Sequence, residues 1–406
     1  MSAITREKLQ QAAPLVSEAG LDAWLTLVRE TSDGVDPILP LLFEGNFVWQ
    51  SALLVGRDGR RIAIAGKYDA EAVAATAEWD EVIPYVEGIR EPLVETLGRL
   101  TSAERPRIGV NFSTSDDKAD GLTHGMFVLL ESYLEGTRFA GSLVSAEDVC
   151  RRLRARKSAE EVRRIRAAIA ETDRLFAEIE RFAQVGVSEK AVYDQVQRLI
   201  RERGFGFAWA PSGDPIVNSG PDSMIGHGTP SASITIQPGH IFHVDLGIER
   251  DGFCSDMQRC WYVPRAGESS PPPAVQRAFE AVRDAIQAAF ASLRPGVAGW
   301  EVDEVARQAL VKAGFPEYFH ALGHQVGRVA HDGGAVLGPR WPRYGNTPTI
   351  PVEAGEIYTL EPSVLVEGYG MLGLEEMALV TESGAEWLTS PQRTLGMISS
   401  TAPALA

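Results

Sequence analysis

The chain has 406 residues, a hydrophobic fraction of 44% and a formal net charge of −16. The length suits two domains, and the apolar content is enough for a full core, which excludes a disordered or fibrous protein. A surface this acidic repels phosphate backbones, so we expect no nucleic-acid partner. There is no apolar run of about 18 residues, and the three cysteines form no CxxC pair. We therefore expect a cytoplasmic protein without a membrane segment.

Strand and helix patterns alternate over residues 1–150, which predicts a small α/β domain. The turn RDGR separates two apolar runs, a pattern typical of a β-hairpin. No glycine-rich phosphate loop follows any of the strands. The predicted strands cover 21–28, 47–56, 61–66, 81–86 and 107–112, and the predicted helices cover 1–20, 68–77, 91–100 and 121–136.

The pattern changes at residues 146–184, where apolar residues recur with helical spacing and opposite charges lie three and four residues apart. Ser158, followed by Glu161, is a candidate capping box. This segment predicts a hinge and the first long helix of a second domain, which we place at 151–406. Within that domain we expect helices at 188–203, from the proline-rich loop 270–273 to 292, and at 300–313, and strands at 232–262 and 350–388.

Five residues of the second domain have side chains suited to metal binding: Asp245, Asp256, His324, Glu361 and Glu375. Asp256 lies eleven positions after Asp245, with an Asp-Gly turn between them, so a hairpin would bring both carboxylates together. Both lie in apolar, strand-like segments, where a carboxylate is rarely buried without a partner. Taken singly, each of the five fits a turn, cap or ion pair. Taken together, they favour a two-metal site, in which two cations share and acidify one water.

The order and context of these residues resemble the pita-bread metallopeptidases. The resemblance lies in Asp245 and the aspartate eleven residues later, in HxxGHxxGxxxH at 320–331, in LEP at 360–362 and in GxEExxLVT at 373–381. The family includes methionine aminopeptidases, aminopeptidase P, prolidases and creatinases. Residues 152–168 are similar to the helix that opens the catalytic domain of the Xaa-Pro members.

The resemblance implies an α+β protein of two domains. A C-terminal pita-bread catalytic domain, 151–406, would follow a smaller N-terminal α/β domain of the creatinase/prolidase type, 1–150. The smaller domain would serve substrate access and oligomerisation, and the family often forms homodimers.

The resemblance also implies a role for each ligand. Asp245 would chelate one divalent ion, and Asp256 and Glu375 would bridge both ions. His324 and Glu361 would bind the other ion, and Glu361 would also shuttle the proton of the water that the two ions share. Because carboxylates dominate the set, manganese is the expected metal, with zinc or cobalt as alternatives.

Three further histidines match active-site positions of the family. His227, in MIGHGTPS, would contact the substrate and stabilise the oxyanion. His320 and His331 would contact the peptide and the proline side of the scissile bond. His243 lies two residues before Asp245, so the two share a strand face, and His243 either supports the site or simply packs.

The activity implied is hydrolysis of the bond between an N-terminal residue and a following proline, as in aminopeptidase P or prolidase. The substrate would be a small peptide with proline at position two. Two positions depart from the pattern: Gly373 stands where many Xaa-Pro relatives carry an arginine, and Phe253 where relatives often carry a tyrosine. The missing arginine favours longer peptides over dipeptides, because that arginine helps to hold a dipeptide carboxylate.

Two alternatives share the fold. One is a creatinase-like amidinohydrolase, or another hydrolase of non-peptide C–N bonds, and the other is a binding protein without activity. Neither needs a complete ligand set, so the presence of all five ligand types argues against both.

Overall fold

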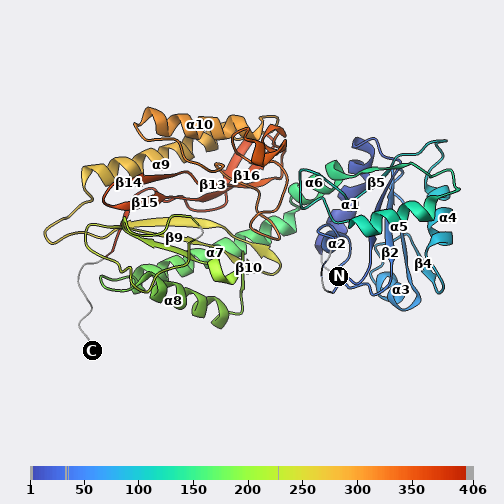
Figure 1. The fold of residues 1–406 in the computed structure, drawn as a ribbon, viewed down its shortest axis with the longest axis horizontal. Helices are drawn as coiled ribbons and strands as arrows, with labels where there is room; N and C mark the ends of the chain where they lie inside the picture. Colours follow the sequence, from blue (N-terminus) through green and yellow to red (C-terminus); the bar gives the residue numbers. More distant parts are fainter. Residues whose placement is uncertain (1–2, 33, 35, 227, 399–406) are drawn as a thin grey trace. The chain divides into compact units, whose positions relative to one another are not determined.

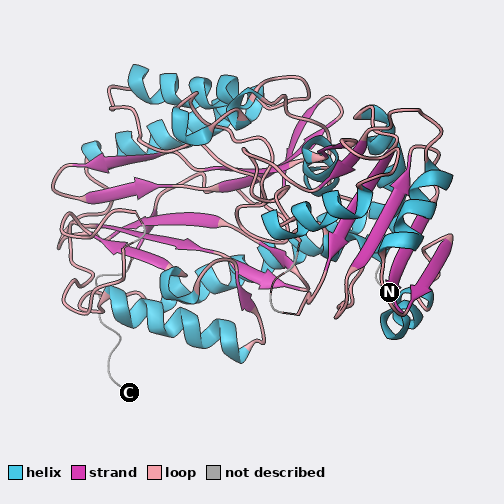
Figure 2. Cartoon of the chain, turned by 45° about the vertical axis from the view of Figure 1, so that its right-hand side comes forward, coloured by secondary structure: helices cyan, strands magenta, loops and turns pink. Residues whose placement is uncertain are grey.

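The computed structural model describes residues 3–32, 34, 36–226 and 228–398, and the chain forms two compact units (Figure 1). Unit 1 comprises residues 1–160 and unit 2 residues 161–406. Both units mix helices and strands (Figure 2), in agreement with the predicted α+β class. Among the helices in the described part of the chain, none combines the length and apolar character needed to span a bilayer.

Unit 1 is built on one six-stranded sheet with the strand order β4-β3-β2-β1-β5-β6. β2 and β3 are antiparallel and form the predicted hairpin around residues 57–60. β3 pairs with β4, β1 with β5 and β5 with β6 in parallel, as expected where helices connect the strands. The strands are β1 (Ala23–Val28), β2 (Ser51–Gly56), β3 (Arg61–Gly66), β4 (Glu81–Tyr85), β5 (Ile108–Val110) and β6 (Leu143–Ser145).

Helices cover both faces of this sheet because the side chains of its central strands alternate between two cores. Trp24 and Val28 of β1 pack in one core with α1, α2 and α6, whereas Leu25 and Leu27 pack in the other with α4 and α5. The helices are α1 (Ala3–Glu18), α2 (Leu39–Leu42), α3 (Lys67–Ala74), α4 (Arg90–Leu100), α5 (His124–Leu134) and α6 (Glu147–Ala155). Local sequence patterns predict neither α2 nor β6, which are short.

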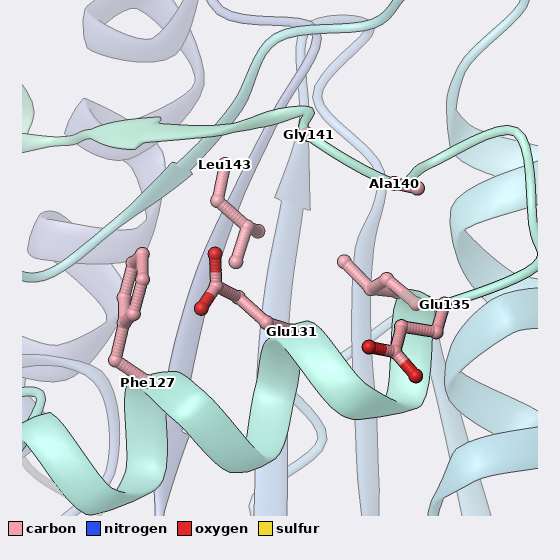
Figure 3. Close-up of a pocket in the computed structure, with 7 residues that line it drawn as sticks. Phe127, Glu131, Glu135, Ala140, Gly141 and Leu143 are labelled. Carbon is pink, nitrogen blue, oxygen red and sulfur yellow. The ribbon is translucent and has the colours of Figure 1, made fainter.

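A hollow of about 270 Å³ lies on unit 1 beside α5. Figure 3 shows Glu131 and Glu135 on α5, with the Glu131 carboxylate pointing toward Leu143. Both glutamates are exposed. The seven described residues of its lining include no histidine, cysteine or aspartate, so the hollow offers only two solvated carboxylates for chemistry. They are Phe127, Glu131, Leu134, Glu135, Ala140, Gly141 and Leu143.

Unit 2 places short sheets between two pairs of helices. In Figure 1, α9 and α10 lie above β14 and β15, and α7 and α8 lie below β9. The helices are α7 (Ala159–Phe182), α8 (Glu189–Glu202), α9 (Pro273–Ser292) and α10 (Gly299–Lys312). The strands are β7 (Gly206–Phe207), β8 (Ile216–Ser219), β9 (Ile241–Leu246), β10 (Ile248–Arg250), β11 (Phe253–Cys254), β12 (Met257–Tyr262), β13 (Ile357–Leu360), β14 (Ser363–Val366), β15 (Gly370–Gly373), β16 (Glu376–Thr381), β17 (Gly384–Trp387) and β18 (Gly396–Met397).

Side chains on both faces hold the helices of unit 2 to the strands. On one face, Phe279 of α9 and Leu310 of α10 are fully buried in a core that also contains Tyr358 of β13. On the other face, the rings of Phe176 on α7 and Trp261 on β12 lie 6.2 Å apart. The strands between the helices are therefore buried on both sides, which leaves their ends as the places where polar chemistry can be built.

Residues 146–184, for which the sequence predicts a hinge and a long helix, form the two helices α6 and α7 with a break at 156–158. Lys8, a fully buried residue of α1, donates hydrogen bonds to the carbonyls of Leu153 (2.6 Å) and Arg156 (2.8 Å). Lys8 thus satisfies carbonyls at the C-terminal end of α6 and stabilises the termination of the helix at this point. Periodicity could not show this cap, because Lys8 is distant in sequence.

The hairpin predicted between the two aspartates forms, and it is built from four short strands instead of two. β9 and β12 are antiparallel, and β10 and β11 continue the pair to its tip. At the tip, Asp251 has φ 53° and Gly252 has φ 79°. Two consecutive residues with positive φ are typical of a tight turn that matches the twist of the flanking strands.

We expect Gly252→Ala to lower the free energy of unfolding by about 1–2 kcal/mol, because a Cβ is disfavoured in this left-handed conformation. The measurement is the thermal unfolding midpoint of the metal-free protein. Asp251→Asn is the matched control, because asparagine tolerates the same conformation. Equal losses in both variants would contradict this explanation of the turn.

Candidate metal centre

The first two candidate ligands lie at one end of the β9–β12 hairpin. Asp245 is the fifth residue of β9, and Asp256 immediately precedes β12. In the register of the two strands, Leu246 pairs with Met257 and Asp245 with Gln258. The two carboxylates therefore follow one another around the same end of the ladder, as the spacing of eleven residues predicts.

The other two carboxylates lie at the end of a second antiparallel pair. Glu361 directly follows β13, and Glu375 directly precedes β16. Leu360 pairs with Glu376 in this ladder, so the two ligand glutamates are neighbours across it. A bridge between Gln258 and Glu375 joins the second pair to the first hairpin.

His324 is brought to the carboxylates by a short stretch of chain that pairs with β13. Thr359 donates its N–H to the His324 carbonyl (2.9 Å), and Glu361 donates its N–H to the Leu322 carbonyl (2.8 Å). His324 Nε2 then lies 3.2 Å from Glu361 Oε1 and 3.7 Å from Asp256 Oδ2. Main-chain pairing thus sets the position of the imidazole.

The tautomer of His324 suits a metal ligand. Its Nδ1 lies 3.3 Å from the carbonyl of Gln325, which can only accept a hydrogen bond. Nδ1 therefore carries the proton, and Nε2 has its lone pair free toward Glu361 and Asp256. A ring nitrogen fixed by a backbone carbonyl on its far side is typical of histidines that bind metals.

Thr359 joins the histidine to one carboxylate. Its Oγ1 accepts the N–H of His324 at 3.1 Å and donates to Glu361 Oε1 at 3.2 Å. One hydroxyl therefore fixes both the main chain of His324 and the side chain of Glu361.

Three ligand oxygens of the cluster lack any hydrogen bond from the described residues. They are Oδ1 of Asp245 and both carboxylate oxygens of Glu375, and all three are buried. A buried polar atom left without a partner costs about 1–3 kcal/mol. Ligand atoms of Asp256, His324 and Glu375 lie within 4.8 Å of one another. Buried, unpartnered oxygens beside an imidazole lone pair fit a divalent cation.

Burial and mutual repulsion set the charge state of three of the carboxyl groups. Burial raises the pKa of Asp245, Asp256 and Glu375 well above the ordinary range, and repulsion from Glu361 raises all three further. Asp214 adds repulsion on the two aspartates. The three groups can ionise together only when a positive charge compensates them. The cluster thus favours cations over neutral ligands.

Glu361 differs from the other three. Burial acts to raise its pKa, but the nearby imidazoles of His324, His320 and His331 outweigh burial, so the pKa of Glu361 is lowered. Its side chain also keeps part of its surface exposed. Glu361 is therefore the carboxylate of the set that most readily gives up its proton.

The three other predicted active-site histidines do not share one environment. Nδ1 of His320 lies 2.8 Å from the Ala321 carbonyl, and its Nε2 lies 3.2 Å from Ser363 Oγ at the start of β14. His331 is exposed, and its ring meets that of His324 edge-on at 4.2 Å between centroids. His227 lies outside the described residues.

A buried ion pair that sequence reasoning missed clamps the chain before His324. Arg307 and Asp303 of α10 make two hydrogen bonds with each other, at 2.9 and 3.0 Å. Arg307 also donates to the His320 carbonyl (3.1 Å), and Asp303 accepts the N–H of Leu322 (3.0 Å). In the sequence, an acid and a base four residues apart on a helix are typical of a surface pair, so burial was the missing information.

A second buried pair holds the segment before β16. Arg259 donates to the carbonyls of Gln258 (2.9 Å) and Glu375 (3.0 Å), and its guanidinium lies 3.2 Å from Glu376. Glu376 therefore holds the guanidinium of Arg259, which in turn fixes the main-chain carbonyl of the candidate ligand Glu375.

His243 is a buried neighbour of Gln258. It is 1% exposed, and burial lowers its pKa to about 4, so the ring is neutral. Its nitrogens lie 3.1 Å from Asn218 Oδ1 and 2.9 Å from Gln258 Oε1. The shared strand face of His243 and Asp245 was the sequence signal for this neighbour, whereas nothing in the sequence singled out Gln258.

Comparison with known protein families identifies the family of this chain. Residues 163–382, more than half of the chain, match metallopeptidase family M24. The chain belongs to this family. The matched range contains all five candidate ligands, and the predicted membership of the pita-bread metallopeptidases is confirmed.

Curated relatives in this family carry the name Xaa-Pro dipeptidase. The one from Lactobacillus helveticus is 29% identical over 249 residues, which are 61% of this chain and 63% of the relative. The one from Pyrococcus horikoshii is 31% identical over 251 residues, which are 61% of this chain and 66% of the relative. The chain therefore spans less than two thirds of the length of these two relatives.

Solved structures confirm the predicted pita-bread fold with its smaller N-terminal part. The dipeptidase PepE from Mycobacterium ulcerans is 26% identical, with a TM-score of 0.72 and 98% of each chain covered. The X-Pro aminopeptidase from Thermotoga maritima is 24% identical, with a TM-score of 0.68 and coverage of 96% of this M24 chain and 99% of its own.

We expect Thr359→Val to weaken manganese binding by about 10- to 100-fold, because the shape is kept while both hydrogen bonds of the hydroxyl are lost. Isothermal titration calorimetry of the metal-free protein measures this. Thr349→Val is the matched control, because Thr349 is exposed and its hydroxyl only donates to the Asn346 carbonyl. An affinity unchanged by Thr359→Val would show that the hydroxyl does not organise the site.

We expect the metal-free protein to lose stability as the pH rises. Asp245, Asp256 and Glu375 have raised pKa values, so the folded protein keeps protons that the unfolded chain releases. A divalent cation compensates the same charges, so the thermal midpoint gained on adding manganese should grow from about pH 5 to about pH 8. Calorimetry with manganese chloride or with a chelator tests this. A gain that shrinks over this interval would contradict the assignment.

Proposed function

We propose that this M24 protein is an Xaa-Pro metallopeptidase that hydrolyses the bond between an N-terminal residue and a following proline. The observation that carries the proposal is the buried cluster of carboxylates and one imidazole, with three oxygens that lack a hydrogen bond from the described residues. The names of the two curated relatives support the choice of substrate.

The five ligands would hold two divalent ions. We assign Asp245 to one ion, Asp256 and Glu375 to both, and His324 and Glu361 to the other. Carboxylate oxygens dominate the set, which favours manganese, with zinc or cobalt as alternatives. Ions held here lower the pKa of water, so that a strong nucleophile is present at neutral pH.

Glu361 is the residue suited to move the proton. Its lowered pKa leaves it ionised, its side chain is partly exposed, and Thr359 holds its Oε1. We assign it the proton of the attacking water, which it then delivers to the proline nitrogen as the C–N bond breaks. The tetrahedral oxyanion and the two sides of the peptide would be contacted by His227, His320 and His331.

The remaining assignments follow from the same family resemblance. We propose that residues 151–406 form the catalytic domain and that residues 1–150 serve substrate access and oligomerisation. The assembly that we propose is a homodimer, which sedimentation velocity can test. Cys150, Cys254 and Cys260 are free and buried, which fits the reducing cytoplasm that we propose as the location.

The test compares one Xaa-Pro dipeptide with the matching Xaa-Pro tripeptide in the presence of manganese. We expect turnover of at least one of them, and a loss of at least about 100-fold in Asp256→Asn and His324→Ala, because each removes a direct ligand. His124→Ala is the matched control, since His124 is exposed on α5 of unit 1. Inactivity on both peptides with manganese bound would overturn the proposed substrate.

A further inference from the structure

Gln258 lies in the middle of the candidate metal centre without being a candidate ligand. It pairs with Asp245 across the β9–β12 ladder and bridges to Glu375. Its side chain is 7% exposed, and its Nε2 donates to Glu361 Oε2 at 3.4 Å. Thr359 holds the other oxygen of the same carboxylate. The two oxygens of Glu361 are therefore approached by two different donors, from β12 and from β13.

The opposite end of the Gln258 amide is fixed by His243. Gln258 Oε1 lies 2.9 Å from His243 Nε2, which donates to it when the neutral ring carries its proton there; His243 Nδ1, which then has no proton, lies 3.1 Å from Asn218 Oδ1. Asn218 is in turn tied to the main chain, because its Nδ2 donates to the Met224 carbonyl at 2.9 Å. The amide of Gln258 thus ends a row of buried polar side chains that leads from β8 to Glu361.

The absence of a side chain at Gly373 provides the space that the Gln258 amide occupies. A Cβ at position 373 would lie 2.7 Å from Gln258 Oε1 and 3.3 Å from His243 Nε2. The nearest of these atoms is the end of a flexible side chain, so an added methyl group would displace the amide rather than the backbone. A glycine at 373 and an oriented glutamine at 258 therefore depend on each other.

The side chain of Gln258 has no part in holding its own strand. The main-chain carbonyl of Gln258 accepts the N–H of Glu375 (3.3 Å) and a guanidinium N–H of Arg259 (2.9 Å). These links do not involve the amide. Removal of the side chain should therefore leave β12 and its bridge to Glu375 in place.

We propose that Gln258 is a positioning residue for Glu361, with its amide oriented by His243 and given space by Gly373. The amide directs Oε2 of Glu361 while Thr359 directs Oε1, so the carboxylate is presented in one orientation for cation binding and proton transfer. The inference rests on the proposed function for its catalytic consequence. A residue that orients a metal ligand typically changes metal affinity or activity by about 10- to 100-fold when it is lost.

A double-mutant cycle tests the proposal, with Gln258→Ala, Gly373→Ala and the double variant. We expect manganese affinity, measured by titration calorimetry of the metal-free protein, to fall by about 10- to 100-fold in Gln258→Ala and in the same direction in Gly373→Ala. The double variant should bind no more weakly than Gln258→Ala, because the methyl group at 373 then has no amide to displace. The turnover number should fall with little change in KM.

The matched control is Gln276→Ala. Gln276 is a partly buried glutamine of the same unit whose Nε2 donates to a glutamate, Glu280 Oε1, at 2.9 Å. It lies on α9 and outside the cluster. This variant should match the wild type in manganese affinity and turnover. Thermal midpoints of all variants show that each one folds.

The split between the turnover number and KM is the readout that a purely structural role would not change, because a disordered site would raise KM as well as lower the turnover number. A KM that rises along with the loss of turnover in Gln258→Ala would therefore contradict the positioning role. Wild-type manganese affinity in Gln258→Ala, or additive losses in the double variant, would overturn the positioning role.

The two proposals fail in different ways. A wild-type protein that binds manganese but cleaves no Xaa-Pro peptide overturns the proposed substrate. Even then, the calorimetric comparison of Gln258→Ala with Gln276→Ala decides whether Gln258 orients a metal ligand.

Discussion

Several carboxylates buried side by side are unstable unless a positive charge joins them. Asp245, Asp256 and Glu375 are in this situation, and Glu361 adds a further negative charge at their edge. Repulsion adds to burial in raising the pKa of each of these three, and both carboxylate oxygens of Glu375 are buried without a hydrogen-bond partner among the described residues. The rest of unit 2 can be understood as the framework that keeps these groups together despite their repulsion.

In this framework, hydrogen-bonded pairing of the main chain sets the positions of the ligands. The four carboxylate ligands lie at the ends of two antiparallel ladders, and a bridge between Gln258 and Glu375 joins the ladders. Two buried arginines, Arg259 and Arg307, bind carbonyls next to the ligands without using the carboxylates that a cation needs. Positive charge is thus close to the site but directed at the backbone. The ligand oxygens stay available.

Much of the fold was predictable because its signals are local. Alternation and turn residues predicted the hairpin of β2 and β3, and the Asp-Gly turn predicted the hairpin that carries Asp245 and Asp256. The motif pattern pointed to the family. The end of α6 was not predictable, because the lysine that caps it lies far away in the sequence.

The supporting side chains of the site escaped prediction for a related reason. Gln258 is an amide on a strand, and its partners His243 and Glu361 lie 15 and 103 residues away in the chain. Asp303 and Arg307 have the spacing of an ordinary surface pair. In each case the chemistry depends on burial and on contacts that only the folded chain provides.

The order of the ligands along the chain has a consequence for biosynthesis. The β9–β12 hairpin brings Asp245 and Asp256 together early, whereas Glu375 follows more than a hundred residues later and must pair through Gln258. A chain that stops before Glu375 therefore lacks one candidate ligand and the bridge to Gln258, so it cannot form the complete cluster.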